Sequence, residues 1–221
     1  MGKVSIEQRP EIINQKQRFG DWEIDTIVGK ENKGAILTVT ERKTGFLLMK
    51  KLPKGKNAKA LAKELFSLLL PYKEHVLSIT SDNGTEFYEH KWIAQKLDTD
   101  YFFAHPYSSW ERGLNEYTNK LIRQYIPKKE VFTNYTDKQI LDIQHKLNRR
   151  PRKLLNFEEP FSMFYKMINY KVAFNTRIYA CPYIRRIPTH QKQKKNVFSK
   201  SPAKKIQSRE SCLIYTRHYT D

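Results

Sequence analysis

The sequence has few of the features that mark secreted, membrane or zinc-stabilised proteins. It contains two cysteines, Cys181 and Cys212, in 221 residues, and they lack the paired spacing of a zinc site. A disulfide framework needs more cysteines, so we expect free thiols in a reducing compartment. No apolar run approaches the ~20 residues of a membrane span, and the N-terminus lacks the apolar core of a signal peptide. We therefore expect a soluble, cytoplasmic protein.

Acidic residues are scarce relative to basic ones. There are 41 Lys and Arg against 23 Asp and Glu, which gives a net charge of +18. Such an excess predicts a polyanionic partner, with DNA or RNA first, although a basic protein that binds without doing chemistry has the same composition. The hydrophobic share of 39% and the aromatic share of 13% indicate a folded domain rather than a disordered chain.

The basic excess is concentrated at one end of the chain. Residues 170–221 carry a net charge of +10, which is more than half of the total. The length allows one sizeable core, so we expect an N-terminal arm or linker over residues 1–19, a folded core over 20–168 and a basic tail over 169–221. For the tail, a disordered extension is favoured over an arm that lies on the DNA backbone.

Apolar periodicity predicts a mixed α/β fold. Three β-prone runs separated by short polar turns predict an antiparallel meander. Helices and strands then alternate, with Asn57 as the N-cap of the first helix and Pro71 at its end. This order, which the ribonuclease-H-like fold shares, predicts a mixed sheet with helices on both faces. The expected strands cover residues 22–28, 34–40, 45–52, 76–80 and 101–104, and the expected helices cover 57–70, 88–96, 112–125, 137–148 and 160–167.

Three acidic residues lie where such a fold would gather them. Asp25 is midway along the first strand, Asp82 follows the fourth strand at an Asn83–Gly84 turn, and Glu116 lies in the first half of a helix. A carboxylate inside a strand is costly unless it is paired or bound to metal. Converging carboxylates can hold two Mg²⁺ ions, which activate an attacking oxygen and stabilise the leaving one. Taken singly, each acid is equally well explained as an edge charge, a turn residue or a solvated helix acid.

The sequences around the three acids decide between these interpretations. They are GDWEID at 20–25, TSDNGTEF at 80–87 and HPYSSWERGLNE at 105–116, and LIRQYIPK follows at 121–128. They resemble the three catalytic motifs of bacterial insertion-sequence DDE transposases, specifically the IS-thirty family. Residues 83–115 separate the second acid from the third, which is the spacing that this family shows. The resemblance extends from about Val4 to Tyr165.

The resemblance implies a ribonuclease-H-like integrase core that cleaves DNA strands and joins them in transposition. It implies dependence on Mg²⁺ or Mn²⁺, with two ions, and Asp25, Asp82 and Glu116 as catalytic residues and metal ligands. The implied partners are transposon ends and target DNA, in a homo-oligomer associated with the bacterial nucleoid, without a membrane or a small-molecule cofactor. Members of the family also have an N-terminal helix-turn-helix region, which we expect this chain to lack.

Basic and polar residues recur at helical spacing around Glu116 and again around Pro151. They are suited to phosphate contacts, whereas a solvated face is the plainer interpretation. Trp110 can either stack on a base or pack in the core. Glu86 is close enough to Asp82 to support it, but we do not expect it to be a metal ligand. The predicted DNA-binding residues are Arg112, Asn119, Lys120, Arg123, Arg149 and Arg150.

Two other functions share much of this pattern. A truncated, non-catalytic remnant would bind DNA with a steep salt dependence but would not cleave it in Mg²⁺ or Mn²⁺, and it would modulate a full-length transposase. A nuclease acting on RNA–DNA hybrids would share the metal chemistry, but the three motifs argue against it. Assays of strand transfer and of hybrid cleavage distinguish these functions from a DNA transposase.

Overall fold

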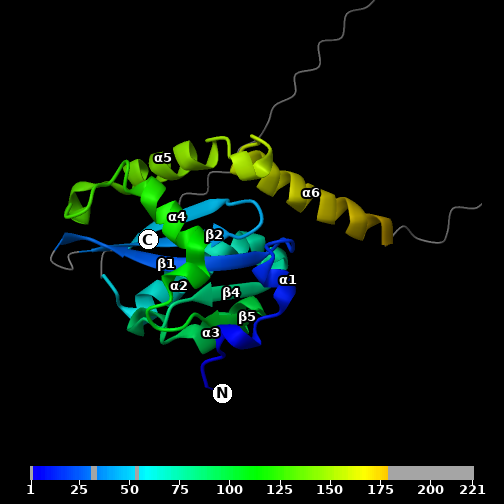
Figure 1. The fold of residues 1–221 in the computed structure, drawn as a ribbon, viewed down its shortest axis with the longest axis horizontal. Helices are drawn as coiled ribbons and strands as arrows, with labels where there is room; N and C mark the ends of the chain where they lie inside the picture. Colours follow the sequence, from blue (N-terminus) through cyan, green and yellow to red (C-terminus); the bar gives the residue numbers. More distant parts are fainter. Residues whose placement is uncertain (1, 31–33, 53–54, 179–221) are drawn as a thin grey trace, which may run out of the picture. The chain divides into compact units, whose positions relative to one another are not determined.

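The protein is described by a computed structural model over residues 2–30, 34–52 and 55–178. Cys181, Cys212 and nearly all of the expected tail therefore lie outside the described residues. The strands form one five-stranded sheet in the order β3-β2-β1-β4-β5 (Figure 1). The strands are β1 (Asp21–Val28), β2 (Ala35–Glu41), β3 (Leu47–Leu52), β4 (Ser78–Ser81) and β5 (Asp100–Phe103).

The sheet is mixed in the way that the sequence predicts. The first three strands form an antiparallel meander, whereas β4 runs parallel to β1, and β5 runs parallel to β4. Parallel neighbours require crossover connections, and helices supply them. The expected helices are confirmed as α2 (Ala58–Leu69), α3 (His90–Leu97), α4 (Gly113–Ile122), α5 (Asp137–Asn148) and α6 (Pro160–Ile178).

Helices cover both faces of the sheet because alternate strand residues are apolar on both sides. On one face, Trp22 and Ile24 pack in a core with residues of α2, α3 and α6. On the other face, Ile27 and Met49 pack with residues of α4 and α5. Figure 1 shows α4 lying across the sheet. This second face is the one that carries the candidate site.

The outer edge of β3 is closed by side-chain amides from α5. The backbone N–H of Leu47 donates to Asn148 Oδ1 at 2.8 Å, and Asn148 Nδ2 donates to the Leu47 carbonyl at 2.8 Å. The N–H of Met49 donates to Gln144 Oε1 at 2.6 Å. Unpaired edge groups invite pairing with another chain, so these amides protect the edge and fix α5 against it.

Both ends of the described chain contain more regular structure than the sequence pattern indicates. The segment expected to be an arm forms the short helices η1 (Ile6–Gln8) and α1 (Glu11–Asn14), with Ile6 and Ile13 buried. A parallel bridge joins Ser5 to Phe103. At the other end, α6 continues ten residues beyond Ile168, over a stretch that contains neither Gly nor Pro. No helix in the described part of the chain has the length and apolar character that a membrane span requires.

Candidate active site

The parallel pairing of β1 with β4 brings Asp25 and Asp82 to the same edge of the sheet. The last paired residues are Glu23 and Thr80, and each acid lies two positions further along its own strand direction. The neighbour of β1 on its other side, β2, is antiparallel. Ligands of open α/β sheets bind outside the carboxyl ends of the parallel strands, where the strand order changes. The two acids therefore mark the expected position of a site.

The guanidinium of Arg112 joins the two carboxylates. Its Nη1 lies 3.3 Å from Asp25 Oδ1 and its Nη2 lies 3.3 Å from Asp82 Oδ2. The side chains of Asp25 and Asp82 are 18% and 34% exposed. Burial raises the pKa of Asp25, Arg112 lowers it, and the charge of Asp82 raises it, with a net upward shift. Ionised Asp25 is therefore less stable in the folded protein than in water.

The turn after β4 fixes the Asp82 carboxylate. The Gly84 N–H donates to Asp82 Oδ1 at 2.9 Å, and Asn83 Nδ2 donates to the Ala104 carbonyl at 2.6 Å. A Cβ atom at position 84 would lie 2.9 Å from Asp82 Oδ1 and would also collide with the carboxylate of Glu86. Glycine lets both carboxylates keep these positions, whereas a larger residue would displace them, in keeping with the Asp-Asn-Gly sequence.

The structure does not bring Glu116 into contact with the other two acids. Its carboxylate is 3.0 Å from Lys120 Nζ, and its side chain is 47% exposed. The next polar residue on the same helical face, Asn119, contacts Asp25 instead, with Nδ2 donating to Oδ2 at 2.9 Å. No group of three His, Cys, Asp or Glu side chains close enough to hold a metal ion occurs among the described residues.

Asp25 and Asp82 nevertheless suit a hard divalent cation. Such cations prefer carboxylate oxygens, and these two carboxylates already share a single positive charge, that of Arg112. Asp25 Oδ2 and Oδ1 also accept hydrogen bonds from Asn119 Nδ2 and from the Thr26 N–H. The carboxylate oxygens at this edge are therefore of the kind that a divalent cation prefers, and the side chain of Glu116 lies outside the set.

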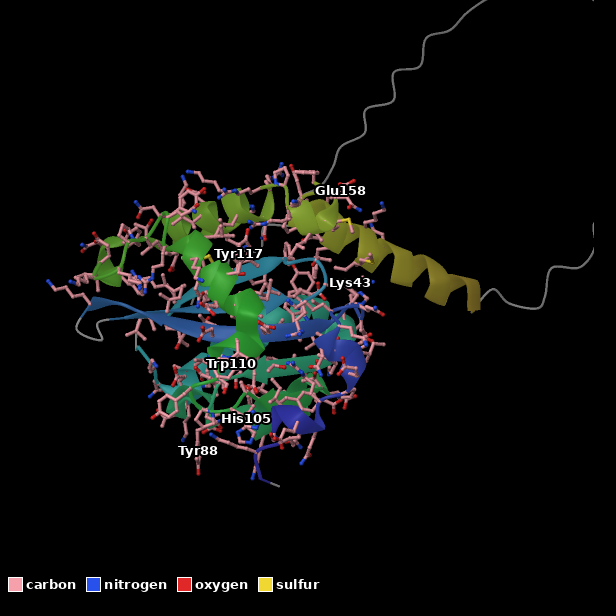
Figure 2. The ribbon with its side chains drawn as sticks, in the orientation of Figure 1. Lys43, Tyr88, His105, Trp110, Tyr117 and Glu158 are labelled. Carbon is pink, nitrogen blue, oxygen red and sulfur yellow. The ribbon has the colours of Figure 1, made fainter. Side chains whose placement is uncertain are left out.

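A pocket of about 310 Å³ opens beside Asp82. Its rim includes Tyr107, which is fully exposed and has a left-handed backbone with φ of 62°. Trp110 is also exposed rather than packed in the core, and Figure 2 shows it at the start of α4. The pocket is lined by Asp82, Asn83, Gly84, His105, Pro106, Tyr107, Ser108 and Arg112.

The residues predicted to contact DNA divide into two groups. Arg112 and Asn119 contact the acids of the site, as described above, and Lys120 pairs with Glu116. The others lie just beyond the ends of α4 and α5. Arg123 donates to the Pro127 carbonyl at 3.1 Å, Arg149 lies over the ring of Phe161 at 5.3 Å, and Arg150 donates to Gln124 Oε1 at 3.0 Å.

Two buried charged residues behind the site escape detection by sequence motif. Glu23, two residues before Asp25, is fully buried and pairs with buried Arg42. Its second oxygen accepts a hydrogen bond from the Asn115 N–H at 3.0 Å, in the first turn of α4. The available signal is the alternation of acids along β1, Asp21-x-Glu23-x-Asp25, which places all three on one face of the strand.

A second carboxylate lies buried near the site. Glu86 accepts a hydrogen bond from Thr26 Oγ1 at 2.7 Å and pairs with Lys56 Nζ at 2.7 Å. The net effect of these contacts is to lower the pKa of Glu86, although burial opposes it. Glu86 therefore supports the strand that carries Asp25.

The ion pair between His105 and Glu111 predicts a pH dependence of stability. His105 Nδ1 lies 2.8 Å from Glu111 Oε1, and this contact raises the pKa of His105 above its usual 6.5. Because the pKa of His105 is higher in the folded protein than in the unfolded chain, protonated His105 stabilises the fold below pH about 6.5. This stabilisation is lost as the pH rises through the folded-state pKa. We expect the melting temperature to fall across this range, and His105→Gln to remove that part of the slope. An unchanged slope in the variant would contradict this assignment.

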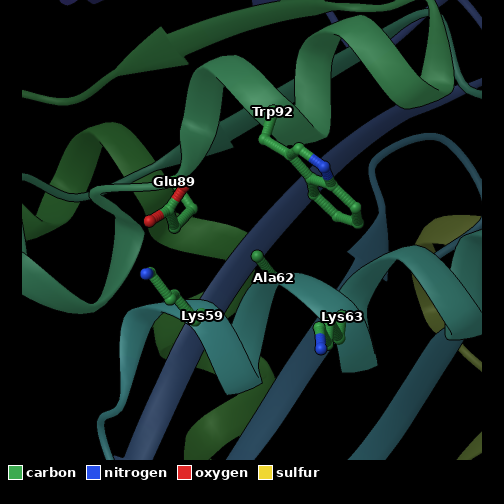
Figure 3. Close-up of a pocket in the computed structure, with 5 residues that line it drawn as sticks. All are labelled: Lys59, Ala62, Lys63, Glu89 and Trp92. Atoms are coloured by element: carbon green, nitrogen blue, oxygen red, sulfur yellow. The ribbon is translucent and has the colours of Figure 1, made fainter.

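A second pocket, of about 190 Å³, lies between α2 and α3 on the opposite face of the sheet. Figure 3 shows Lys59 and Lys63 of α2 on one side of it and Glu89 and Trp92 on the other. None of the predicted site residues lines this pocket. The carboxylate pair on the other face is therefore the candidate active site.

The five-stranded mixed sheet with its helices matches the fold of a known integrase catalytic core domain. The crystal structure of the catalytic core domain of BIV integrase superposes with a TM-score of 0.55, over 69% of this chain and 98% of that one, at 20% sequence identity. At this identity the match concerns the fold. No family model matches the chain.

Curated relatives of the chain are insertion-sequence transposases. The chain is 52% identical over 174 residues to the transposase for insertion sequence element IS4351 of Bacteroides fragilis, covering 78% of this chain and 53% of the relative. It is 34% identical over 156 residues to the transposase InsI for insertion sequence element IS30A of Escherichia coli, covering 70% and 40%. Over this region the chain is similar to insertion-sequence transposases. It spans about half the length of the relatives it matches.

Proposed function

We propose that this chain is the catalytic core of a DDE-type DNA transposase, which cleaves DNA strands and transfers them to new sites. The observation that carries the proposal is the Asp25–Asp82 pair, held at adjacent parallel strand ends by one shared cationic group. Phosphoryl transfer needs charge neutralisation and positioning more than covalent chemistry. A pair of carboxylates that binds cations is suited to neutralise and position the reacting phosphate.

We propose that Asp25, Asp82 and Glu116 hold Mg²⁺ or Mn²⁺, as two ions. When bound, the metal would supply an activated attacking oxygen and neutralise the charge of the leaving one. Glu116 precedes Asn119 by three residues on α4, so the two side chains share a helical face, and Asn119 already reaches Asp25. Release of the half-exposed Glu116 carboxylate from Lys120 would let it turn toward the same acids.

The residues around the acids have separate roles in this proposal. Asn119 and the Thr26 N–H orient the Asp25 carboxylate, and the Gly84 N–H orients that of Asp82. A metal ion would take over the charge neutralisation that Arg112 provides. Arg112 would then be free to bind a phosphate oxygen of the DNA, for which a guanidinium is suited.

The proposed substrate is DNA, at transposon ends and at the target, bound by a homo-oligomer in the bacterial cytoplasm at the nucleoid. The net charge of +18 supports a polyanionic partner. The predicted contacts are Arg112, Asn119, Lys120, Arg123, Arg149 and Arg150. Their positions along α4 and after α5 would give the DNA a path that begins at the acid pair.

A strand-transfer assay on element-end DNA tests the proposal. The 221-residue chain should nick or join labelled DNA in Mg²⁺ or Mn²⁺ and should do neither in EDTA. Binding with a steep salt dependence but no cleavage in either metal would instead indicate a non-catalytic, DNA-binding remnant. Cleavage confined to the RNA strand of a hybrid would indicate a ribonuclease-H-type nuclease.

A further inference from the structure

The connection between α5 and α6 contains a loop with an unusual backbone. Asn156 and Phe157 are consecutive residues with φ of 52° and 64°. Asn tolerates the left-handed conformation, as at the end of a helix, whereas a bulky residue such as Phe157 adopts it only at a cost. Two in succession persist only where surrounding contacts hold them, and such strain often accompanies a functional role.

Backbone hydrogen bonds close this loop on itself. The Arg152 carbonyl accepts from the N–H groups of both Leu155 and Phe157, each at 2.9 Å, and the Arg152 N–H donates to the Glu158 carbonyl at 3.1 Å. The Arg152 side chain adds a bond from Nη2 to the Leu147 carbonyl at 3.0 Å. The loop is thus tied to the end of α5.

The loop is also connected to the catalytic helix. The Arg152 guanidinium lies over the ring of Tyr117, at 5.9 Å from its centroid, and Tyr117 directly follows Glu116. Arg150 donates to Gln124, just beyond α4. Figure 2 shows Tyr117 on α4 and Glu158 near the start of α6, where the loop ends. DNA that lies along α4 would therefore meet this loop.

The same loop presents two large apolar side chains to solvent. Leu154 is 93% exposed and Phe157 is 72% exposed. A closed loop could bury such side chains against α5 or α6, as the ring of Phe161 is partly buried against the main core. Single exposed apolar residues need no explanation, but two of them on a strained, hydrogen-bonded loop do.

Basic residues surround this apolar pair. Residues 143–157 contain five Lys and Arg, together with His145, and no Asp or Glu. Glu158 and Glu159 follow immediately after this stretch. The segment therefore combines a polyanion-binding charge with an apolar tip. Proteins that wedge apolar side chains between base steps of duplex DNA share this combination.

We propose that Leu154 and Phe157 form an apolar wedge that contacts the bases of duplex DNA, while the flanking basic residues bind its phosphates. This inference rests on the proposed function, because DNA must first occupy the face of α4. The wedge would unstack or bend the duplex next to the acid pair. The loop would thus contact the bases of the DNA, whereas Arg149 and Arg150 are proposed to contact its backbone.

Charge favours DNA over a second copy of this chain as the occupant. A two-fold contact places the same patch of both copies face to face. Here it would bring two segments with five Lys and Arg each into contact without an acid inside either segment, and like charges across an interface oppose association. A polyanion neutralises the same charges.

The test compares two double variants of the 221-residue chain on a duplex DNA that contains 2-aminopurine. Leu154→Ala/Phe157→Ala should weaken binding about tenfold or more, since the variant loses the contact of two side chains with the bases. This variant should leave the salt slope, which is the change of log binding constant with log salt concentration, as in wild type. It should abolish the increase in 2-aminopurine fluorescence that accompanies binding. Arg150→Ala/Lys153→Ala should lower the salt slope by about 0.9 per lost phosphate contact.

Leu70→Ala is the matched control, because Leu70 is a half-exposed leucine on η3 (Leu70–His75). Wild-type affinity and fluorescence change in Leu154→Ala/Phe157→Ala would overturn the wedge. So would unchanged DNA binding with a loss of dimers in light scattering, which would assign the pair to self-association. Failure of the wild-type chain to bind duplex DNA at all would instead overturn the proposed function.

Discussion

Asp25→Asn is expected to reduce strand transfer by about a thousandfold or more and, in EDTA, to raise the melting temperature. The amide keeps the shape of the side chain but cannot supply the negative charge that the proposed cation needs. The opposite effect on stability follows from the raised pKa of Asp25, since ionised Asp25 is disfavoured in the fold. Sites built for charge stabilisation are commonly unfavourable for folding.

Asp82→Asn and Glu116→Gln should cause losses of activity of similar size. Mg²⁺ titration followed by calorimetry gives a second measurement that does not depend on turnover, and each variant should bind the ion more weakly than wild type. Glu64→Gln, which replaces a partly exposed acid paired loosely with Lys50 at 3.9 Å, is the control and should be active. A Glu116→Gln protein as active as wild type would remove Glu116 from the catalytic residues.

Arg42→Ala is expected to have the largest effect on folding. It would leave the Glu23 carboxylate buried without its cation and would delete the hydrogen bond from Arg42 Nε to the Ile13 carbonyl. Breaking a buried ion pair in this way typically costs about 3–5 kcal/mol, against a total stability of about 5–15 kcal/mol for a domain. Urea unfolding monitored by tryptophan fluorescence measures the loss, and a cost below about 1 kcal/mol would contradict it.

Replacing both partners separates stability from the positioning of α4. Glu23→Leu/Arg42→Met should recover much of the stability, because apolar replacements of a buried pair are often neutral or better. It should not recover strand transfer, since the Asn115 N–H at the start of α4 loses its acceptor. Full activity in a stable double variant would show that Glu23 has only a structural role.

Local patterns in the sequence predict the elements of this fold well. The alternation in β1 and the helical spacing in α2 follow from the geometry of each element, which turns a regular set of residues toward the core. The N-cap Asn57 is confirmed because its Oδ1 accepts a hydrogen bond from the Ala60 N–H. The helix expected over residues 112–125 instead begins at Gly113 and ends at Ile122. Arg112 has non-helical angles, and the residues before Pro127 form a turn because proline cannot continue a helix.

The sequence by itself determined the acids, their motifs and the mixed α/β order, because these depend on residue types and short spacings. The tertiary structure alone decided which groups meet. The β1–β4 register brings Asp25 and Asp82 together, and Arg112 joins them from the start of α4, whereas Glu116 turns to Lys120. The buried ion pair between Glu23 and Arg42 connects β1 to the residue that follows β2. Such contacts depend on strand register, helix placement and side-chain torsions, which no local pattern encodes.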